Sequence, residues 1–136
     1  MIRVMGVDIG EKRIGIAVSD MLGITAQGVE TYTRVGDCDA EYIAGKAREL
    51  GADRIVAGLP LNMNGSEGPA VQNVRAFMAQ VEAQGMPVVF QDERLTTVSA
   101  ERTLLEADVS REKRRQVVDK LAAMYILRAY LDTHKI

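Results

Sequence analysis

The first third of the chain alternates between apolar runs and short polar segments. Apolar side chains dominate residues 2–9 and 14–18, and the polar residues 10–13 lie between them. Two short apolar runs around a polar turn predict a β-hairpin. Residues 23–33 alternate less cleanly, but their Val and Thr side chains favour a third strand.

The remainder of the chain alternates between helical and strand patterns. One stretch with apolar residues at helical spacing meets Gly51, and a second begins at Pro69 and meets Gly85, the residue type that commonly terminates helices. Short apolar runs between these stretches favour buried strands. The helices are predicted at residues 39–50, 69–85, 97–106 and 110–133, and the strands at 54–59 and 87–91.

This order of elements is typical of a mixed α/β sheet. Three consecutive strands pair antiparallel, whereas strands separated by a helix pair in parallel. The 136 residues match the usual size of one domain. We therefore expect residues 1–136 to form a single α/β domain with a five-stranded mixed sheet, antiparallel in its first three strands and then parallel, flanked by helices.

Composition mainly excludes classes of protein and of site. Hydrophobic residues make up 47% and charged residues 26% of the chain, as in globular proteins. No apolar run approaches the roughly 20 residues that cross a bilayer, and none forms a signal peptide before Asp8, so we expect a cytoplasmic protein. The one cysteine, Cys38, and the one histidine, His134, exclude zinc sites built on these residue types, Ser-His-Asp triads and Cys-His nucleophiles. Carboxylates must then carry any catalysis.

Asp8 is the first acid placed where chemistry could occur. It follows an apolar strand and shares a face with Val4 and Gly6 by alternation, and an unpaired charge buried there would cost several kcal/mol. The alternative is an acid at a strand end that pairs with Lys12 or Arg13.

Asp119 is the second such acid. Ala122 and Ala123 share its face of the last predicted helix. Small alanines let a helix approach a sheet closely, which would bring Asp119 near the strand ends. The alternative is a simple ion pair with Arg115 or Lys120.

Asp92 and Glu93 follow the strand predicted at 87–91, at the edge where α/β sheets place ligands. Adjacent acids on a strand point to opposite faces, so only one of them can share a site with Asp8. The other would be a surface carboxylate or a partner of Arg94. The pattern alone does not choose between them.

Carboxylates from three separate elements, without His or Cys, are the ligands that Mg²⁺ or Mn²⁺ prefers. Without a cation such carboxylates would repel one another. Two ions about 3.5–4 Å apart could activate a water and stabilise the leaving oxygen of a phosphodiester. Three carboxylates are few for two ions, so one ion plus a substrate phosphate is the alternative.

Basic residues supply a candidate surface for nucleic acid. The net charge of −2 gives no general attraction to a polyanion, so a local patch would be needed. Positive residues gather in the first turns of the last predicted helix, the end where the helix dipole disfavours them. Most such runs are solvated helix faces, but phosphate binding would explain this placement. The candidates are Lys12, Arg13, Arg94, Arg111, Lys113, Arg114 and Arg115.

The loop at residues 62–68 is rich in Asn and Gly and precedes a predicted helix. Its backbone N–H groups could bind phosphate at the helix start, with Asn62 and Asn64 as nucleic-acid-binding side chains. It is not a Walker loop, because no Gly-Lys-Ser/Thr follows. A tight structural turn is the equal alternative.

Four ordered motifs resemble the YqgF (RuvX) family, bacterial members of the RNase H-like nuclease superfamily. They lie at residues 8–20, 58–68, 92–97 and 118–123, and together they extend over nearly the whole chain. The resemblance implies an RNase H-like fold. It also implies that Asp8, Glu93 and Asp119 form the metal-binding catalytic set, which selects Glu93 over Asp92.

Family members are assigned to maturation of the 5′ end of the 16S ribosomal RNA precursor or to the resolution of Holliday junctions in branched DNA. We expect a metal-dependent nuclease that acts on structured RNA, with junction resolution second. Resolving a junction symmetrically would need a homodimer with two sites on a two-fold axis.

Two other classes compete with the nuclease interpretation. The first motif also resembles the phosphate loop of actin-like kinases, but those proteins close two such domains over a nucleotide and 136 residues supply one. A non-catalytic nucleic-acid-binding factor would need the basic patch but not three converging acids.

Overall fold

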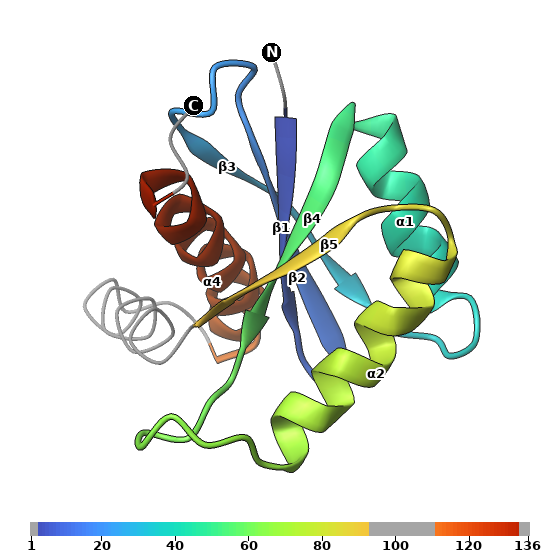
Figure 1. The fold of residues 1–136 in the computed structure, drawn as a ribbon, viewed down its shortest axis with the longest axis vertical. Coiled ribbons are helices and arrows are strands. Elements are labelled where there is room, and N and C mark those ends of the chain that lie inside the picture. Colours follow the sequence, from blue (N-terminus) through green and yellow to red (C-terminus); the bar gives the residue numbers. More distant parts are fainter. Residues whose placement is uncertain (1–2, 93–110, 134–136) are drawn as a thin grey trace.

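The computed structural model describes residues 3–92 and 111–133, and of residues 111–118 the helical backbone alone. Its sheet has five strands in the order β3-β2-β1-β4-β5 (Figure 1). β1 pairs antiparallel with β2 and β2 with β3, whereas β1 pairs in parallel with β4 and β4 with β5. The predicted mixed sheet is confirmed. The strands are β1 (Arg3–Ile9), β2 (Arg13–Ser19), β3 (Ala26–Thr33), β4 (Ala52–Leu59) and β5 (Val88–Asp92).

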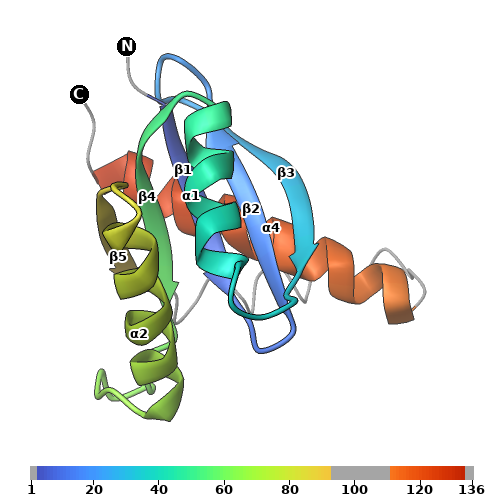
Figure 2. The same cartoon turned by 90° about the vertical axis from the view of Figure 1, so that its right-hand side faces the viewer.

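Helices cover both faces of this sheet. α1 (Asp39–Glu49) and α2 (Pro69–Ala83) lie on one face, and α4 (Arg111–Thr133) crosses the other (Figures 1 and 2). Strand alternation divides the apolar side chains between two clusters. Met5 and Val7 pack with α1 and α2, whereas Val4 packs with α4.

Turn residues explain where several elements begin and end. Gly51 and Gly85 follow α1 and α2 with φ of +75° and +95°, which confirms both as helix terminators. The strand predicted from residue 23 begins only at Ala26. The Asp20 carboxylate accepts the N–H groups of residues 22 and 24 at 3.2 and 2.8 Å, and this side-chain turn delays the strand.

α4 approaches the sheet closely. Ala122 and Ala123 are fully buried, as their pattern predicted. The sheet contributes glycines at the same contact: a Cβ atom added at Gly6 would lie 2.8 Å from Cβ of Leu127 and 3.0 Å from the carbonyl oxygen of Ala123. The close packing therefore depends on small residues in both layers.

Two further predictions concern a helix at residues 97–106 and the absence of a membrane-spanning segment. The helix expected at residues 97–106 lies outside the described residues. Among the helices that are described, none is both long and apolar enough to cross a bilayer.

Candidate functional site

Asp8 lies near the end of β1, on the side of the sheet that α4 covers. Val4 and Gly6, four and two residues before it, both contact α4, so alternation places Asp8 on the same face. In the antiparallel ladder Asp8 pairs directly with Gly15 of β2. Gly15 therefore marks the position beside Asp8.

Asp119 reaches the same place from α4. A Cβ atom added at Gly15 would overlap the carbonyl oxygen of Asp119, so the α4 backbone rests on this glycine. Because Gly15 is the ladder partner of Asp8, one residue of β2 is adjacent to both acids. The structure thus brings the backbones of two of the three predicted metal ligands next to the same glycine.

Arg13, at the start of β2, forms an ion pair with Asp119. Its Nε–H donates to Oδ2 of Asp119 at 2.8 Å, and the two side chains are 29% and 20% exposed. The alternatives considered from the sequence were Arg115 and Lys120 of the same helix. Among the described side chains, the hydrogen-bond partner comes from the hairpin, and Lys120 extends its aliphatic stem over Gly28. The side chain of Arg115 lies outside the described residues.

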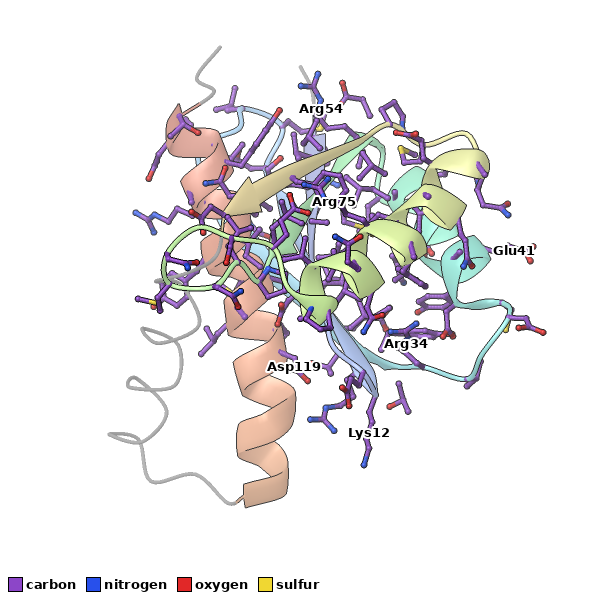
Figure 3. All side chains as sticks on the ribbon, turned by 60° about the horizontal axis from the view of Figure 1, so that its bottom comes forward. Lys12, Arg34, Glu41, Arg54, Arg75 and Asp119 are labelled. Atoms are coloured by element: carbon purple, nitrogen blue, oxygen red, sulfur yellow. The ribbon has the colours of Figure 1, made fainter. Side chains whose placement is uncertain are left out.

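A pocket of about 280 Å³ opens beside this ion pair. It is lined by Gly10, Glu11, Lys12, Arg13 and Asp119. Figure 3 shows Lys12 and Asp119 at the same end of the molecule, with Arg34 beside them. Two of the predicted phosphate-binding residues, Lys12 and Arg13, therefore share a pocket with a predicted metal ligand.

Arg34 holds the hairpin turn that carries this pocket. Its Nη1 donates to the carbonyl oxygen of Gly10 at 2.8 Å, and its backbone N–H donates to the carbonyl oxygen of Lys12 at 2.9 Å. The guanidinium also lies 4.7 Å from the centre of the Phe77 ring of α2 and contacts Asp39 at 3.3 Å. This residue cannot be identified from the sequence, because an Arg after a strand gives no signal of its own.

Asp39, in the first turn of α1, is a buried carboxylate with several donors. It accepts the backbone N–H groups of Val35 and Gly36 at 2.9 and 3.3 Å and the Tyr32 hydroxyl at 2.9 Å. Burial alone would raise the pKa of Asp39, but these donors and Arg34 outweigh it and hold the pKa below its ordinary value. Burial and the bond to Asp39 raise the pKa of Tyr32 to about 12, so its hydroxyl stays a donor.

Replacing Asp39 by Asn is expected to lower the free energy of unfolding by about 2 kcal/mol at pH 7, because buried donors lose an ionised acceptor. A carboxylate with a depressed pKa stabilises the fold above its unfolded pKa and loses this contribution as pH falls through the folded value. The cost of Asp39→Asn should therefore shrink below about pH 4. Urea unfolding at pH 7 and in acid measures it.

The matched control is Asp37→Asn, two residues away on the exposed surface. Its effect should stay within about 0.5 kcal/mol at both pH values. Equal costs for the two variants at pH 7 would contradict the assignment of Asp39 as the acceptor that holds Arg34.

Asp92, the last residue of β5, falls on the opposite face from Asp8. Val89 packs with the α4 cluster and Phe90 with the α1 and α2 cluster, so alternation puts Asp92 on the side of Phe90. Asp92 pairs with Leu59, which belongs to that same cluster. The other acid considered at this edge, Glu93, lies outside the described residues, as does Arg94.

The side chains of the loop at 62–68 hydrogen-bond to one another. Nδ2 of Asn62 donates to the Ser66 hydroxyl at 3.0 Å, and Oδ1 of Asn64 accepts the Ser66 backbone N–H at 3.0 Å. Glu67 forms an ion pair with Arg75 of α2 at 3.0 Å. These bonds favour the structural-turn alternative for the loop, and neither Asn62 nor Asn64 lines the pocket at Asp119.

The remaining basic candidates lie in the first turns of α4, which project beyond β3 in Figure 2. The structure describes the helical backbone there, and the side chains of these residues lie outside the described part. They are Arg111, Lys113, Arg114 and Arg115.

The described donors can be tested against a hard divalent cation. Asp8 and Asp119 supply carboxylate oxygens from different elements, the donor type that Mg²⁺ and Mn²⁺ prefer. Within residues 3–92 and 111–133, no three His, Cys, Asp or Glu residues gather into a metal site. A site with three carboxylates would thus require a ligand from outside these ranges.

Solved structures similar to this chain show the fold. RuvC of T. thermophilus, solved in complex with a Holliday junction substrate, superimposes on this chain with a TM-score of 0.58 at 14% identity. The match covers 99% of each of the two chains. The large terminase nuclease of phage G20c gives a TM-score of 0.54 at 14% identity, over 91% of this chain and 81% of that one. The expected RNase H-like fold is confirmed.

Sequence comparisons show the family. Proteins of Clostridioides difficile and Moorella thermoacetica, each named "Putative pre-16S rRNA nuclease", are 54% identical over 132 residues, which is 96% of this chain and 94% of each relative. A relative of the same name from Listeria monocytogenes is 49% identical over 136 residues. The family model described as "RuvX: Holliday junction resolvase" matches residues 2–133. The chain belongs to the RuvX family.

Proposed function

We propose that this chain is a divalent-metal-dependent nuclease in which Asp8, Glu93 and Asp119 hold Mg²⁺ or Mn²⁺. The observation that carries the proposal is the contact at Gly15, which lies beside Asp8 in the sheet and under the backbone of Asp119. Two acids 111 positions apart in sequence would not be adjacent in the fold without a close helix contact. Names of relatives at 54% identity also support a nuclease.

Glu93 is the third proposed metal ligand because its neighbour Asp92 lies on the wrong face of the sheet. Strand alternation turns Asp92 away from the face of Asp8, and the family motif supplies the acid that follows it. The proposal therefore takes Glu93 as the third ligand.

The bound cation would activate a water and stabilise the leaving oxygen of a phosphodiester. The protein's own groups would do the rest. Asp8 and Asp119 bind and orient the cation, and Lys12 and Arg13 attract the phosphate of the substrate into the adjoining pocket. Arg34 holds the turn that positions the side chains of Lys12 and Arg13.

A wider surface would bind the nucleic-acid backbone. We place on it the basic residues of the first turns of α4, and Arg94 beside Glu93. Asn62 and Asn64 are exposed within the turn that their bonds to Ser66 form, so the loop at 62–68 would contribute phosphate contacts from that turn. These residues would contact phosphates in any sequence, so they would supply affinity rather than sequence specificity.

The substrate we propose first is the 16S ribosomal RNA precursor, cut at its 5′ end in the cytoplasm. The names of the curated relatives support this substrate. The description of the family model supports a second candidate, resolution of Holliday junctions by a homodimer.

One experiment separates these substrates: depletion of the protein in cells, followed by mapping of the 5′ end of 16S RNA. Precursor with an extended 5′ end should accumulate and should disappear when the wild-type chain, but not Asp8→Asn, is supplied. Normal mature ends after depletion, together with paired nicks in a four-way DNA junction by the purified protein, would favour the second candidate.

A further inference from the structure

We propose that Arg13 acts as a counter-ion that a divalent cation displaces from Asp119, and that its freed guanidinium then binds a phosphate of the substrate. The inference rests on the proposed function, because it takes Asp119 as a metal ligand. It adds a counter-ion role for Arg13 before the cation binds and a coupling between cation and substrate.

The backbones on both sides of the ion pair are held in place. Arg13 pairs with Thr33 in the β2–β3 ladder, and its carbonyl oxygen accepts the Gly10 N–H at 2.9 Å. The backbone of Asp119 rests on Gly15. Side-chain rotation can therefore separate the guanidinium from the carboxylate without moving either backbone.

The ion pair is accessible to exchange. It rests on an Nε–H contact of 2.8 Å between side chains that are 29% and 20% exposed. A pair that solvent reaches from both side chains is easier to exchange than a fully buried one. A divalent cation that binds several carboxylates at once can therefore displace the guanidinium from Asp119 without disturbing the core.

The released guanidinium has a place to act. Arg13 and Asp119 line the same pocket of about 280 Å³, together with Lys12. A guanidinium presents a planar set of donors that matches phosphate oxygens. Arg13 would thus neutralise Asp119 before the cation binds and contact the substrate afterwards.

Thermodynamic linkage makes this exchange measurable. A cation that binds Asp119 frees Arg13 and so favours phosphate binding by Arg13. The coupling is reciprocal, because a phosphate that binds Arg13 frees Asp119 for the cation. Cation binding should therefore add one phosphate contact to nucleic-acid binding.

The first test measures Mn²⁺ affinity of the full chain by electron paramagnetic resonance. Arg13→Gln should bind Mn²⁺ about fivefold more tightly than wild type, because the cation no longer displaces an ion pair. Lys12→Gln is the matched control: it removes the same charge from the same turn and the same pocket, and should change the affinity less. In an Asp119→Asn background, Arg13→Gln should have little further effect.

The outcomes separate this inference from the function on which it rests. Equal gains in Mn²⁺ affinity for Arg13→Gln and Lys12→Gln would mean that general charge repulsion explains the gain. That result would overturn the proposed exchange but not the proposed metal site. If wild type and both variants bind no Mn²⁺, the proposed metal site is wrong and the exchange with it. Arg13→Lys, which keeps the charge, should lie between wild type and Arg13→Gln and serves if the glutamine variant fails to fold.

The second test measures the salt dependence of binding to a labelled RNA hairpin, with and without Ca²⁺. Without Ca²⁺, wild type and Arg13→Gln should show similar log–log slopes. With Ca²⁺, the wild-type slope should be steeper than the slope of Arg13→Gln by about one unit, which is the contribution of one phosphate contact. The same difference between the two proteins in both conditions would overturn the exchange.

Discussion

Asp8→Asn and Asp119→Asn are each expected to lower the rate of nucleic-acid cleavage about a hundredfold or more. A metal-held charge stabilises the transition state by several kcal/mol, and each 1.4 kcal/mol corresponds to a tenfold change in rate. Both variants should still fold, since Asp119 loses only a partly exposed ion pair. Cleavage of precursor RNA in Mg²⁺ or Mn²⁺, with thermal unfolding of each variant, measures both effects.

Asp92→Asn is the matched control for these variants. It removes a carboxylate at the same edge of the sheet but on the opposite face, and it should retain most of the activity. Glu93→Gln should behave like Asp8→Asn. An inactive Asp92→Asn beside an active Glu93→Gln would reverse the assignment of the third ligand.

Gly15→Ala should have the largest effect on stability and should also lower activity. The added methyl group would overlap the carbonyl oxygen of Asp119, so α4 must move away from β2 or the strand must distort. Overpacking of this kind costs about 3 kcal/mol. The same movement would displace the Asp119 carboxylate from Asp8. Urea unfolding and the cleavage assay measure the two consequences.

Gly45→Ala is the matched control, since the same change of glycine to alanine is expected to stabilise the protein at this position. Among the described residues, no atom outside the backbone of α1 itself and the two chain neighbours lies within 4 Å of a Cβ added at Gly45, which lies inside α1. Alanine there should stabilise the protein by about 0.5–1 kcal/mol and leave cleavage unchanged. Similar stabilities of the two variants would contradict the close contact between α4 and Gly15.

Local patterns were sufficient for most of the secondary structure. The hairpin, the helices that end before Gly51 and Gly85, and the inward face of Ala122 and Ala123 all follow from residue type and spacing. The start of β3 was wrong by three residues, because the Asp20 side chain forms a turn with backbone N–H groups that no apolar pattern reveals.

The partner of Asp119 shows why part of the site could not be predicted. Within one helix, residues three and four positions away are always near, so helix neighbours were the natural candidates. The observed partner, Arg13, is 106 positions away and is brought close by the packing of α4 on the sheet. The bonds from Arg34 to Asp39 and to the Gly10 carbonyl also depend on the positions of three separate segments.

The sequence by itself determined the kinds of chemistry available to this protein and the strands and helices that carry it. One Cys and one His left carboxylates as the candidate catalytic groups, and periodicity placed Asp8 on a definite face of its strand. Only the tertiary structure decided which of these groups meet. Periodicity reports which side of an element is buried, but not which residue of another element lies against it. Here the absence of a side chain at Gly15 allows α4 to approach β2, and that single contact places Asp119 beside Asp8 and within reach of Arg13.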